Sequence, residues 1–285
     1  MIAIPLIDLG SAEYLGFPGG LYPNGKNSRP SAYERAGVAL GATVQPVGKD
    51  GKPSRSGKIA MICVGMSNTS REFSQFVQLA DADARTNPDL VMIDAARNGM
   101  TATDIAIPLT EYWRHVDRQL KRREISAPQV QIVWLKLALA HEPPGFPEKA
   151  RLLQQAMRST VEILSKKFLQ LKLIYVSSRI YGGYSETDLN PEPIAYESGF
   201  AVKWLIEERV NSQNPEKSIP WVAWGPYLWA NGLTPRSDGL IWERSDFAPD
   251  GVHPSAQGIL KVARMLLEFF QNDTAARPWF FASTK

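Results

Sequence analysis

The stretch that decides the fold reads KIAMICVGMSNTSREFSQFVQLA and runs from residue 58 to residue 80. It begins with an apolar run of strand length, residues 58–64. After Arg71 the apolar residues recur at helical spacing, at Phe73, Phe76, Val77 and Ala80. Ser67 therefore lies where a predicted strand turns into a predicted helix. In a parallel sheet this is the carboxyl end of the strand, the edge at which open α/β folds bind ligands.

The position of Ser67 has two interpretations. The amino terminus of a helix offers free N–H groups and a partial positive charge, which suit a developing oxyanion and favour a nucleophilic serine. Ser, Asn and Thr residues in front of a helix are also common helix caps. The local sequence alone leaves both interpretations open.

A second polar stretch, DGVHP at residues 250–254, supplies the other groups that a nucleophilic serine needs. Such a serine requires a base, and the base requires an orienting carboxylate. Asp250 can reach the Nδ1 side of His253 if the residues between them form a turn, which Gly251 makes easy. Pro254 suits the first turn of the helix predicted to follow. Taken alone, His253 fits a surface or capping role better than a catalytic one.

The two stretches together resemble the SGNH hydrolase superfamily, also called GDSL-type esterases and lipases. The first block of that superfamily carries the nucleophile in a G-D-S pattern, and this chain has Gly65-Met66-Ser67-Asn68, with Met66 in place of the usual aspartate. The last block, D-x-x-H-P, matches residues 250–254. The order of the blocks also matches, and the resemblance covers roughly residues 58–270. It implies a flavodoxin-like SGNH hydrolase fold and a catalytic triad of Ser67, His253 and Asp250.

The resemblance also implies an oxyanion hole. The loop after a predicted strand at residues 90–94 occupies the place of the second block, whose glycine donates a backbone N–H, and Gly99 matches that glycine. The N–H groups of Ser67 and Gly99 would then hold the oxyanion, since a glycine leaves no side chain in the way. Without the resemblance, Gly99 reads equally well as an ordinary turn glycine.

The third block of the superfamily, G-x-N-D, is missing. Its asparagine is the third oxyanion donor, but no asparagine follows the predicted strand at residues 128–136. A lost donor typically costs on the order of 3 kcal/mol in the transition state. Asn68, Lys136 and His141 are candidates to replace it; otherwise the hole has two backbone donors only.

The alternation of strands and helices predicts a three-layer α/β/α sandwich with a mostly parallel sheet of about five strands. The expected strands cover residues 58–64, 90–94, 128–136, 171–176 and 219–229 with its exit. The expected helices cover residues 69–84, 103–123, 148–169, 196–211 and 255–271. Trp279, near the end of the chain, is expected to pack on the surface.

Residues 1–57 are rich in Gly and Pro, and we expect an arm that packs on the main domain of residues 58–285. One short helical turn is expected in the arm, at residues 31–37. The arm could form one wall of the substrate site. No internal repeat or linker divides the rest of the chain, which predicts one domain.

Two further groups of residues are candidates for binding substrate. Arg179 and Tyr181 follow the predicted strand at residues 171–176, and strand-end loops face the site in this architecture. Arg179 could equally form an ion pair with Glu186, Glu192 or Glu197. An aromatic cluster follows, which either stacks on sugar rings or packs in the core: Trp221, Trp224, Tyr227, Trp229, Trp242 and Phe247.

Composition excludes several classes of protein. The chain has 285 residues, of which 44% are hydrophobic and 21% charged, as in a soluble globular protein. The net charge is +3 and the longest basic run is residues 121–123, which argues against a nucleic-acid partner. Cys63 is the only cysteine, and with three histidines it predicts neither a disulfide nor a zinc site. No apolar run has membrane-spanning length. The amino terminus lacks signal-peptide features, but a processed chain would look the same, so the compartment stays open.

The functional hypothesis is a serine ester hydrolase that needs no cofactor or metal. The aromatic residues, and the arm, which resembles that of the sugar-esterase branch of the superfamily, favour removal of a short acyl group such as acetyl from a carbohydrate. Asn68, Lys136, Arg179 and Tyr181 are the predicted substrate-binding residues. The alternatives are a catalytically degenerate carbohydrate-binding protein and a lipase or thioesterase of the same superfamily. The sequence fixes neither the acyl group, the alcohol nor the oligomeric state.

Overall fold

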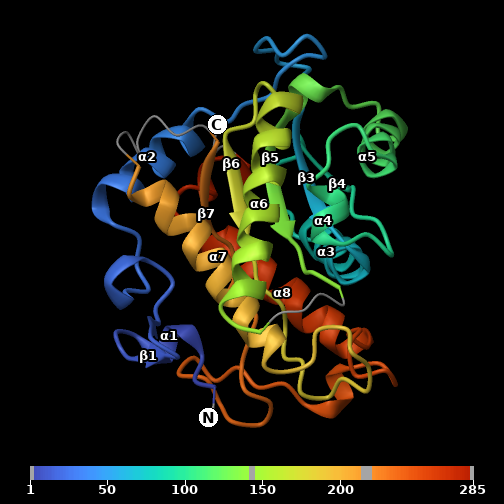
Figure 1. Cartoon of the computed structure of the whole chain (residues 1–285). Coiled ribbons are helices and arrows are strands. Elements are labelled where there is room, and N and C mark those ends of the chain that lie inside the picture. Colours follow the sequence, from blue (N-terminus) through green and yellow to red (C-terminus); the bar gives the residue numbers. More distant parts are fainter. Residues whose placement is uncertain (1–2, 141–144, 213–219, 283–285) are drawn as a thin grey trace.

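The centre of the molecule is a parallel sheet. The structure is a computed structural model that describes residues 3–140, 145–212 and 220–282. Five strands pair in the order β4-β3-β5-β6-β7 (Figure 1), and all neighbours are parallel. Their bounds are β3 Ile59–Gly65, β4 Leu90–Asp94, β5 Val130–Lys136, β6 Leu173–Val176 and β7 Trp221–Trp224. The predicted α/β fold class is confirmed, with the strand order of flavodoxin-like sheets.

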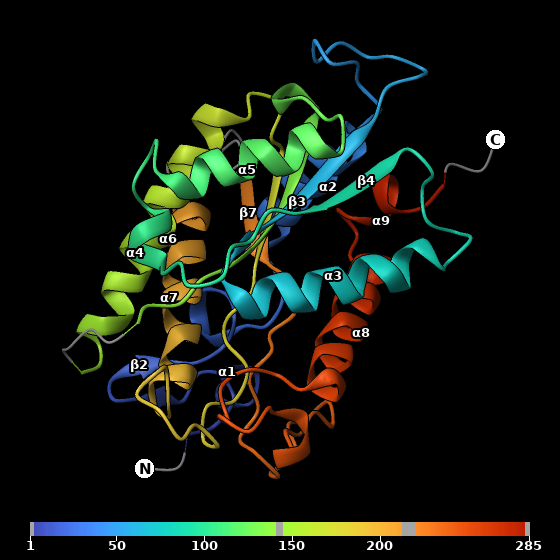
Figure 2. The ribbon, with the colours of Figure 1, turned by 90° about the vertical axis from the view of Figure 1, so that its right-hand side faces the viewer.

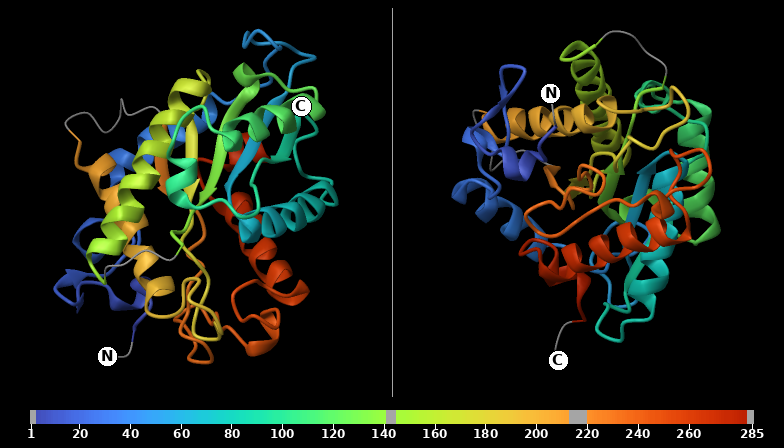
Figure 3. Two further views of the ribbon diagram at one scale, coloured as in Figure 1. Left: turned by 45° about the vertical axis from the view of Figure 1, so that its right-hand side comes forward. Right: turned by 90° about the horizontal axis from the view of Figure 1, so that it is seen from below.

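The strands are apolar throughout because helices cover both faces of the sheet. Successive side chains of a strand point to opposite faces. In β3, Ala60 and Ile62 belong to one buried core, whereas Met61 and Cys63 belong to the other. The first core also contains side chains of α5 Glu111–Arg122, α6 Glu148–Lys167 and α7 Ile194–Val210, and the second contains those of α2 Ser31–Ala42, α3 Ser67–Asp81 and α8 Ala256–Asn272. Figures 2 and 3 show these two helical layers.

The shorter elements lie in the arm and in the connections. They are the helices α1 Leu6–Leu9, α4 Ala102–Ile105 and α9 Arg277–Phe280, the strands β1 Glu13–Tyr14 and β2 Phe17–Pro18, and the 3₁₀ turns η1 Pro23–Gly25, η2 Ala127–Gln129 and η4 Arg244–Asp246. None of the helices in the described ranges has both the length and the apolar character that crossing a bilayer requires.

The topology of the sheet marks the place of a ligand site. The chain passes from β3 to β4 on one side and then returns across β3 to form β5 on the other side. The connections therefore change direction between β3 and β5, and open α/β sheets bind ligands beside such a switch point, at the carboxyl ends of the strands. Ser67 directly follows β3, and α3 packs against α8. The fold thus places the start of α3 at this point.

The arm protects the free edge of the sheet at β7. Of the backbone groups of β7 that face away from β6, the carbonyl of Val222 accepts a hydrogen bond from the Tyr33 hydroxyl at 2.9 Å, and the N–H of Trp224 donates to the Tyr22 hydroxyl at 3.3 Å. Unpaired groups on an edge strand are a template for unwanted pairing, so these two tyrosines stabilise the edge. Tyr22 and Tyr33 of residues 1–57 thus contact β7, and the division into an arm and a main domain stays a prediction.

Three expectations about local structure were wrong. The helix expected at residues 103–123 is two helices, α4 and α5, because Pro108 between them cannot continue a helix. The short turn expected at residues 31–37 is the whole of α2. The helix continues through Gly37, which lies against the ring of Trp221. A Cβ at this position would lie 2.3 Å from the ring. Trp279 is fully buried under α8 and not on the surface, because α9 folds back onto the core.

Candidate active site

Ser67 is the first residue of α3, and its hydroxyl is free of the capping role. Thr69 takes that role: its hydroxyl accepts the N–H of Met66 at 3.3 Å and donates to the carbonyl of Lys136 at 3.0 Å. Position 65 requires glycine, because the Cβ of any other residue would lie 2.3 Å from the Thr69 hydroxyl. The strand-to-helix turn is therefore closed by Gly65 and Thr69, and the Ser67 hydroxyl remains available.

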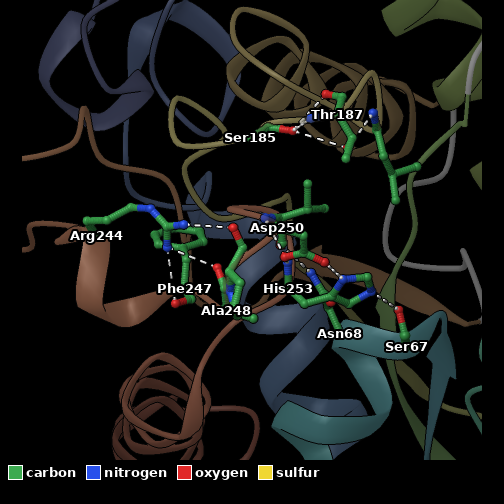
Figure 4. Close-up of polar contacts among 12 residues, drawn as sticks. Ser67, Asn68, Ser185, Thr187, Arg244, Phe247, Ala248, Asp250 and His253 are labelled. Carbon is green, nitrogen blue, oxygen red and sulfur yellow. Dashed lines mark hydrogen bonds and ion pairs between the residues drawn. The ribbon is translucent and has the colours of Figure 1, made fainter.

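The Ser67 hydroxyl faces His253. The Oγ atom lies 3.0 Å from Nε2 of His253, although 186 positions separate the two residues in the chain (Figure 4). On the other side of the ring, Nδ1 lies 2.6 Å from Oδ2 of Asp250. With the ring proton on Nδ1, His253 donates to the carboxylate and accepts the hydroxyl proton at Nε2. The structure thus brings together the three residues of the predicted triad.

Asp250 is held in place by its own turn. Its second oxygen, Oδ1, accepts the backbone N–H groups of Val252 and His253, each at 3.0 Å. Burial by itself would raise the pKa of Asp250, but the hydrogen bonds from the His253 ring and from these N–H groups outweigh it and lower the pKa below its ordinary value. Asp250 is therefore a carboxylate at neutral pH. Gly251 forms the turn at φ 66°, in the left-handed region that glycine adopts readily.

Two side chains anchor this loop from outside. Figure 4 shows the guanidinium of Arg244 against the chain in front of Asp250, where it donates to the carbonyls of Phe247, Ala248 and Pro249 at 3.3, 2.9 and 2.8 Å. On the α3 side, Nδ2 of Asn68 donates to the carbonyl of Val252 at 3.3 Å. Asn68, predicted to bind substrate, is buried and ties the loop to α3. Arg244 was missed because its role depends on how the loop closes, which no spacing indicates.

Gly99 lies in the loop that follows β4. It has φ 75°, and no heavy atom lies within 4 Å of the place of a Cβ. The loop is fixed beside β3, because the N–H of Arg97 donates to the carbonyl of Gly65 at 3.0 Å. The glycine is thus exposed in a loop anchored next to Ser67. Its donor role stays a prediction.

Lys136 is buried in an ion pair with Glu72. Its Nζ atom lies 2.6 and 2.5 Å from the two carboxylate oxygens of Glu72, and the side chains of Lys136 and Glu72 are only 3% and 0% exposed. Burial lowers the pKa of Lys136 and raises that of Glu72, while the ion pair opposes both shifts. The burial of Lys136 argues against the predicted substrate contact. Glu72 escaped prediction, since a single glutamate in a helix is usually exposed. His141, another candidate donor, lies outside the described residues.

Arg179 and Tyr181 occupy different environments. Arg179 is 4% exposed and forms no ion pair with any residue in the described ranges, so the predicted pairing with Glu186, Glu192 or Glu197 is not formed there. Tyr181 is half-buried, edge-on to the ring of Tyr184 at 5.2 Å between centroids. Tyr181 is thus partly exposed, and its contact with substrate stays a prediction, whereas Arg179 is buried.

The tryptophans expected near the site are core residues. All of the aromatic residues proposed for sugar stacking are at most 5% exposed: Trp221, Trp224, Tyr227, Trp229, Trp242 and Phe247. Their indole N–H groups are used internally, as in the bond from Trp242 to the carbonyl of Leu228 at 2.9 Å. The core interpretation holds for this cluster, and it cannot stack on a sugar.

The residues of the site are suited to acyl transfer. A hydroxyl, an imidazole and a carboxylate form one hydrogen-bonded chain at the amino terminus of a helix, which is the arrangement that activates a serine. In the part of the chain that the structure describes, no group of three or more His, Cys, Asp or Glu side chains could hold a metal ion.

No family model and no curated protein matches this sequence. Solved structures that resemble it include a carbohydrate esterase family 3 protein from Talaromyces cellulolyticus (14% identity, 75% of this chain and 97% of that chain, TM-score 0.43). Another is a mutant of an acetyl-xylooligosaccharide esterase from Geobacillus (15% identity, 76% of this chain and 94% of that chain, TM-score 0.43). A third is a GDSL-like lipase from Bacteroides thetaiotaomicron (13% identity, 83% of this chain and 95% of that chain, TM-score 0.39). All three identities are below 25%, so the likeness concerns the fold and not the function of this chain.

Proposed function

We propose that this protein is a serine ester hydrolase. The observation that carries the proposal is the contact of the Ser67 hydroxyl with Nε2 of His253 at 3.0 Å, on a ring whose Nδ1 is bonded to Asp250 at 2.6 Å. Three residues from two distant segments meet in this chain of contacts. A capping serine or a surface histidine would not require it.

In the proposed reaction the Ser67 oxygen attacks the ester carbonyl while its proton moves to Nε2 of His253. The carbonyl oxygen becomes an oxyanion, which the N–H groups of Ser67 and Gly99 bind. Asp250 keeps the proton on Nδ1 and stabilises the imidazolium. When the C–O bond breaks, His253 gives the proton to the departing alcohol and an acyl-serine remains. Water, deprotonated by His253, then releases the carboxylic acid and restores the hydroxyl of Ser67.

We infer a carbohydrate ester with a short acyl group, such as acetyl, as the substrate. The side chains of Asp250 and His253 are 39% and 26% exposed, so the site opens to the surface and admits a large polar alcohol. Tyr181 and Tyr184 are the partly exposed aromatic side chains available to a sugar ring. The buried tryptophans contribute nothing to this inference, which rests on the openness of the site and on the resemblance to sugar esterases.

The test is release of p-nitrophenol from p-nitrophenyl acetate by wild type and by Ser67→Ala. Loss of a triad serine typically lowers kcat by about 10⁶-fold, so the variant should show only background hydrolysis. Ser70→Ala is the matched control, because its hydroxyl lies on the same helix but is bonded to Asp94; it should keep most of the activity. Full activity in Ser67→Ala would overturn the assignment. A fluorophosphonate should label wild type at Ser67 and leave Ser67→Ala unlabelled.

A carbohydrate-binding protein without activity is the alternative that one observation favours, namely the absence of an asparagine after β5. Calorimetry would then show sugar binding, with no turnover of any ester and no fluorophosphonate label. A panel of acetylated sugars, long-chain esters and thioesters separates the proposed acetylesterase from a lipase or thioesterase.

A further inference from the structure

A small cavity lies beside the first turn of α3. Its walls are the residues on either side of Ser67 in α3, the chain that leaves β5 at Leu137 and Ala138, and the side chain of Arg179 from the loop after β6. Its volume is about 10 Å³, room for about one water molecule. The chain after β5 is where the resemblance places the third oxyanion donor. The cavity therefore occupies the region in which that donor is missing.

Two buried polar groups in the lining have no partner among the residues that the structure describes. They are Oδ1 of Asn68 and Nε of Arg179, on side chains that are each 4% exposed. Leaving a buried donor or acceptor unsatisfied costs about 1–3 kcal/mol, and more for a charged group. One water in the cavity would accept from Nε of Arg179 and donate to Oδ1 of Asn68. Both of these residues line the same cavity.

The charge of Arg179 is not neutralised by an adjacent carboxylate in the described ranges. Both oxygens of Glu72 are bonded to Lys136. Glu192 is also occupied: it accepts the N–H groups of Gly182, Tyr196 and the Trp229 ring at 2.8, 3.0 and 2.7 Å. Burial lowers the pKa of Arg179, and Glu72 and Glu192 oppose the shift from a distance. A guanidinium nonetheless stays protonated in proteins, so a cation without a contacting anion lies behind the start of α3.

We propose that Arg179 is an electrostatic positioning residue of the esterase site, whose charge stabilises the oxyanion that forms at Ser67 and compensates for the absent asparagine after β5. This inference rests on the proposed function. In the ground state the carbonyl is neutral and gains little from the cation. In the transition state it carries negative charge, and a charge fixed in the low-dielectric interior acts more strongly than one in bulk water. Arg179 should therefore affect kcat and leave KM almost unchanged.

The experiment compares Arg179→Met, which removes the charge, with Arg179→Lys, which keeps it. Loss of an oxyanion-stabilising group lowers kcat by about 10²–10³-fold; because Arg179 acts through the cavity, we expect roughly 10–100-fold for Arg179→Met. Arg179→Lys should stay within roughly threefold of wild type. Both variants should keep the pH profile of wild type, since neither change touches His253 or Asp250. Near-ultraviolet circular dichroism shows whether each variant is folded.

Chemical rescue gives a second readout. Arg179→Ala enlarges the cavity, and guanidinium chloride at roughly 10–50 mM, far below denaturing concentrations, should raise its kcat with saturation. Arg236→Ala is the matched control: Arg236 is similarly buried at 5% exposure, but it is paired with Asp238 and lies outside the site. Guanidinium should not raise the kcat of that variant or of wild type.

The outcomes are distinct. A folded Arg179→Met variant with the kcat of wild type overturns the inference. If that variant does not fold, Arg179→Lys decides: activity near wild type supports the role of the charge, and a loss of more than about thirtyfold in a folded variant overturns it. If wild type itself neither hydrolyses esters nor reacts with a fluorophosphonate, the proposed function fails. An active wild type matched by Arg179→Met defeats the inference about Arg179 alone.

Discussion

Two polar regions meet at the start of α3, and they are built in opposite ways. The loop of Asp250 and His253 is partly exposed, and its polar atoms have partners within a few residues or on Arg244 and Asn68. The cluster of Glu72, Lys136 and Arg179 is almost completely buried, and its groups come from α3, β5 and the loop after β6. Local hydrogen bonds orient the ring and the carboxylate of the loop, whereas burial removes the charges of the cluster from water and strengthens their field. In the proposed enzyme, orientation and electrostatics therefore come from different parts of the molecule.

The largest expected effect belongs to the loop. Asp250→Asn leaves the shape of the turn but favours the wrong tautomer of His253, so kcat on p-nitrophenyl acetate should fall by on the order of 10³–10⁴-fold. Asp81→Asn, an exposed aspartate at the end of α3, is the control and should behave like wild type. Activity close to wild type in Asp250→Asn would show that this carboxylate does not orient the base.

Substitutions in the buried cluster of Glu72, Lys136 and Arg179 should lower the free energy of unfolding. Lys136→Met leaves the carboxylate of Glu72 buried without its partner, and removing one member of a buried pair typically lowers the free energy of unfolding by 3–5 kcal/mol, here about 4 kcal/mol. The double variant Lys136→Met, Glu72→Leu should recover most of this loss, because no charge is left uncompensated. Urea denaturation of the three proteins measures the difference. Equal stabilities of the single and double variants would contradict the assignment of a coupled pair.

Substitution of Arg244 tests whether the orientation of the loop that carries Asp250 and His253 affects kcat. Arg244→Met removes the donors to three carbonyls in front of Asp250, and the looser loop should lower kcat by about tenfold, equivalent to about 1.4 kcal/mol in the barrier. Arg244→Lys, with fewer donors, should fall between wild type and Arg244→Met. A normal kcat in Arg244→Met would mean that Asp250 and Asn68 hold the loop unaided.

The smallest expected effect is the pH dependence of stability from Asp250. Its pKa is lower in the folded protein than in the unfolded chain, where it is about 3.9. The carboxylate therefore stabilises the folded state above that value, and the contribution is lost as the pH falls through the lowered pKa. Because the side chain is 39% exposed, the contribution should be below about 1 kcal/mol. The urea midpoints of wild type and Asp250→Asn should differ slightly at pH 7, and the difference should shrink as the pH falls through the lowered pKa of Asp250; a difference that grew on acidification would contradict the sign.

Much of the fold followed from local patterns. The apolar runs gave the five strands, with bounds shifted by a few residues, because a strand buried on both faces must be apolar throughout. The break between α4 and α5 at Pro108 and the length of α2 were not anticipated. In α2, Gly37 and Gly41 allow close contacts with Trp221 and with the carbonyl of Ala275. Such contacts depend on segments that lie far away in the chain.

For the candidate site, too, some features could be predicted from the sequence and others could not. Ser67, Asp250 and His253 could be selected from the sequence, because a strand-to-helix turn and a D-x-x-H-P motif place the needed groups on short, rigid segments. Exposure could not be predicted in the same way: Lys136 was predicted to bind substrate, Arg179 either to bind substrate or to form an ion pair, and the tryptophans either to stack on a sugar or to pack in the core, and all of them are buried. Long charged side chains and aromatic rings have no periodic signal that tells a surface from an interior.

Local patterns were enough to predict the layered α/β architecture and to select the hydroxyl, imidazole and carboxylate of the candidate site, since alternation and turn chemistry act within a few residues. Two features follow from the tertiary structure alone: Ser67 and His253 meet across 186 positions, and Arg179 is buried beside Asn68 with no ion pair among the described residues. The physical reason is that packing between distant segments, and the burial that follows from it, is a property of the whole sheet and its helices and is not encoded in any one stretch.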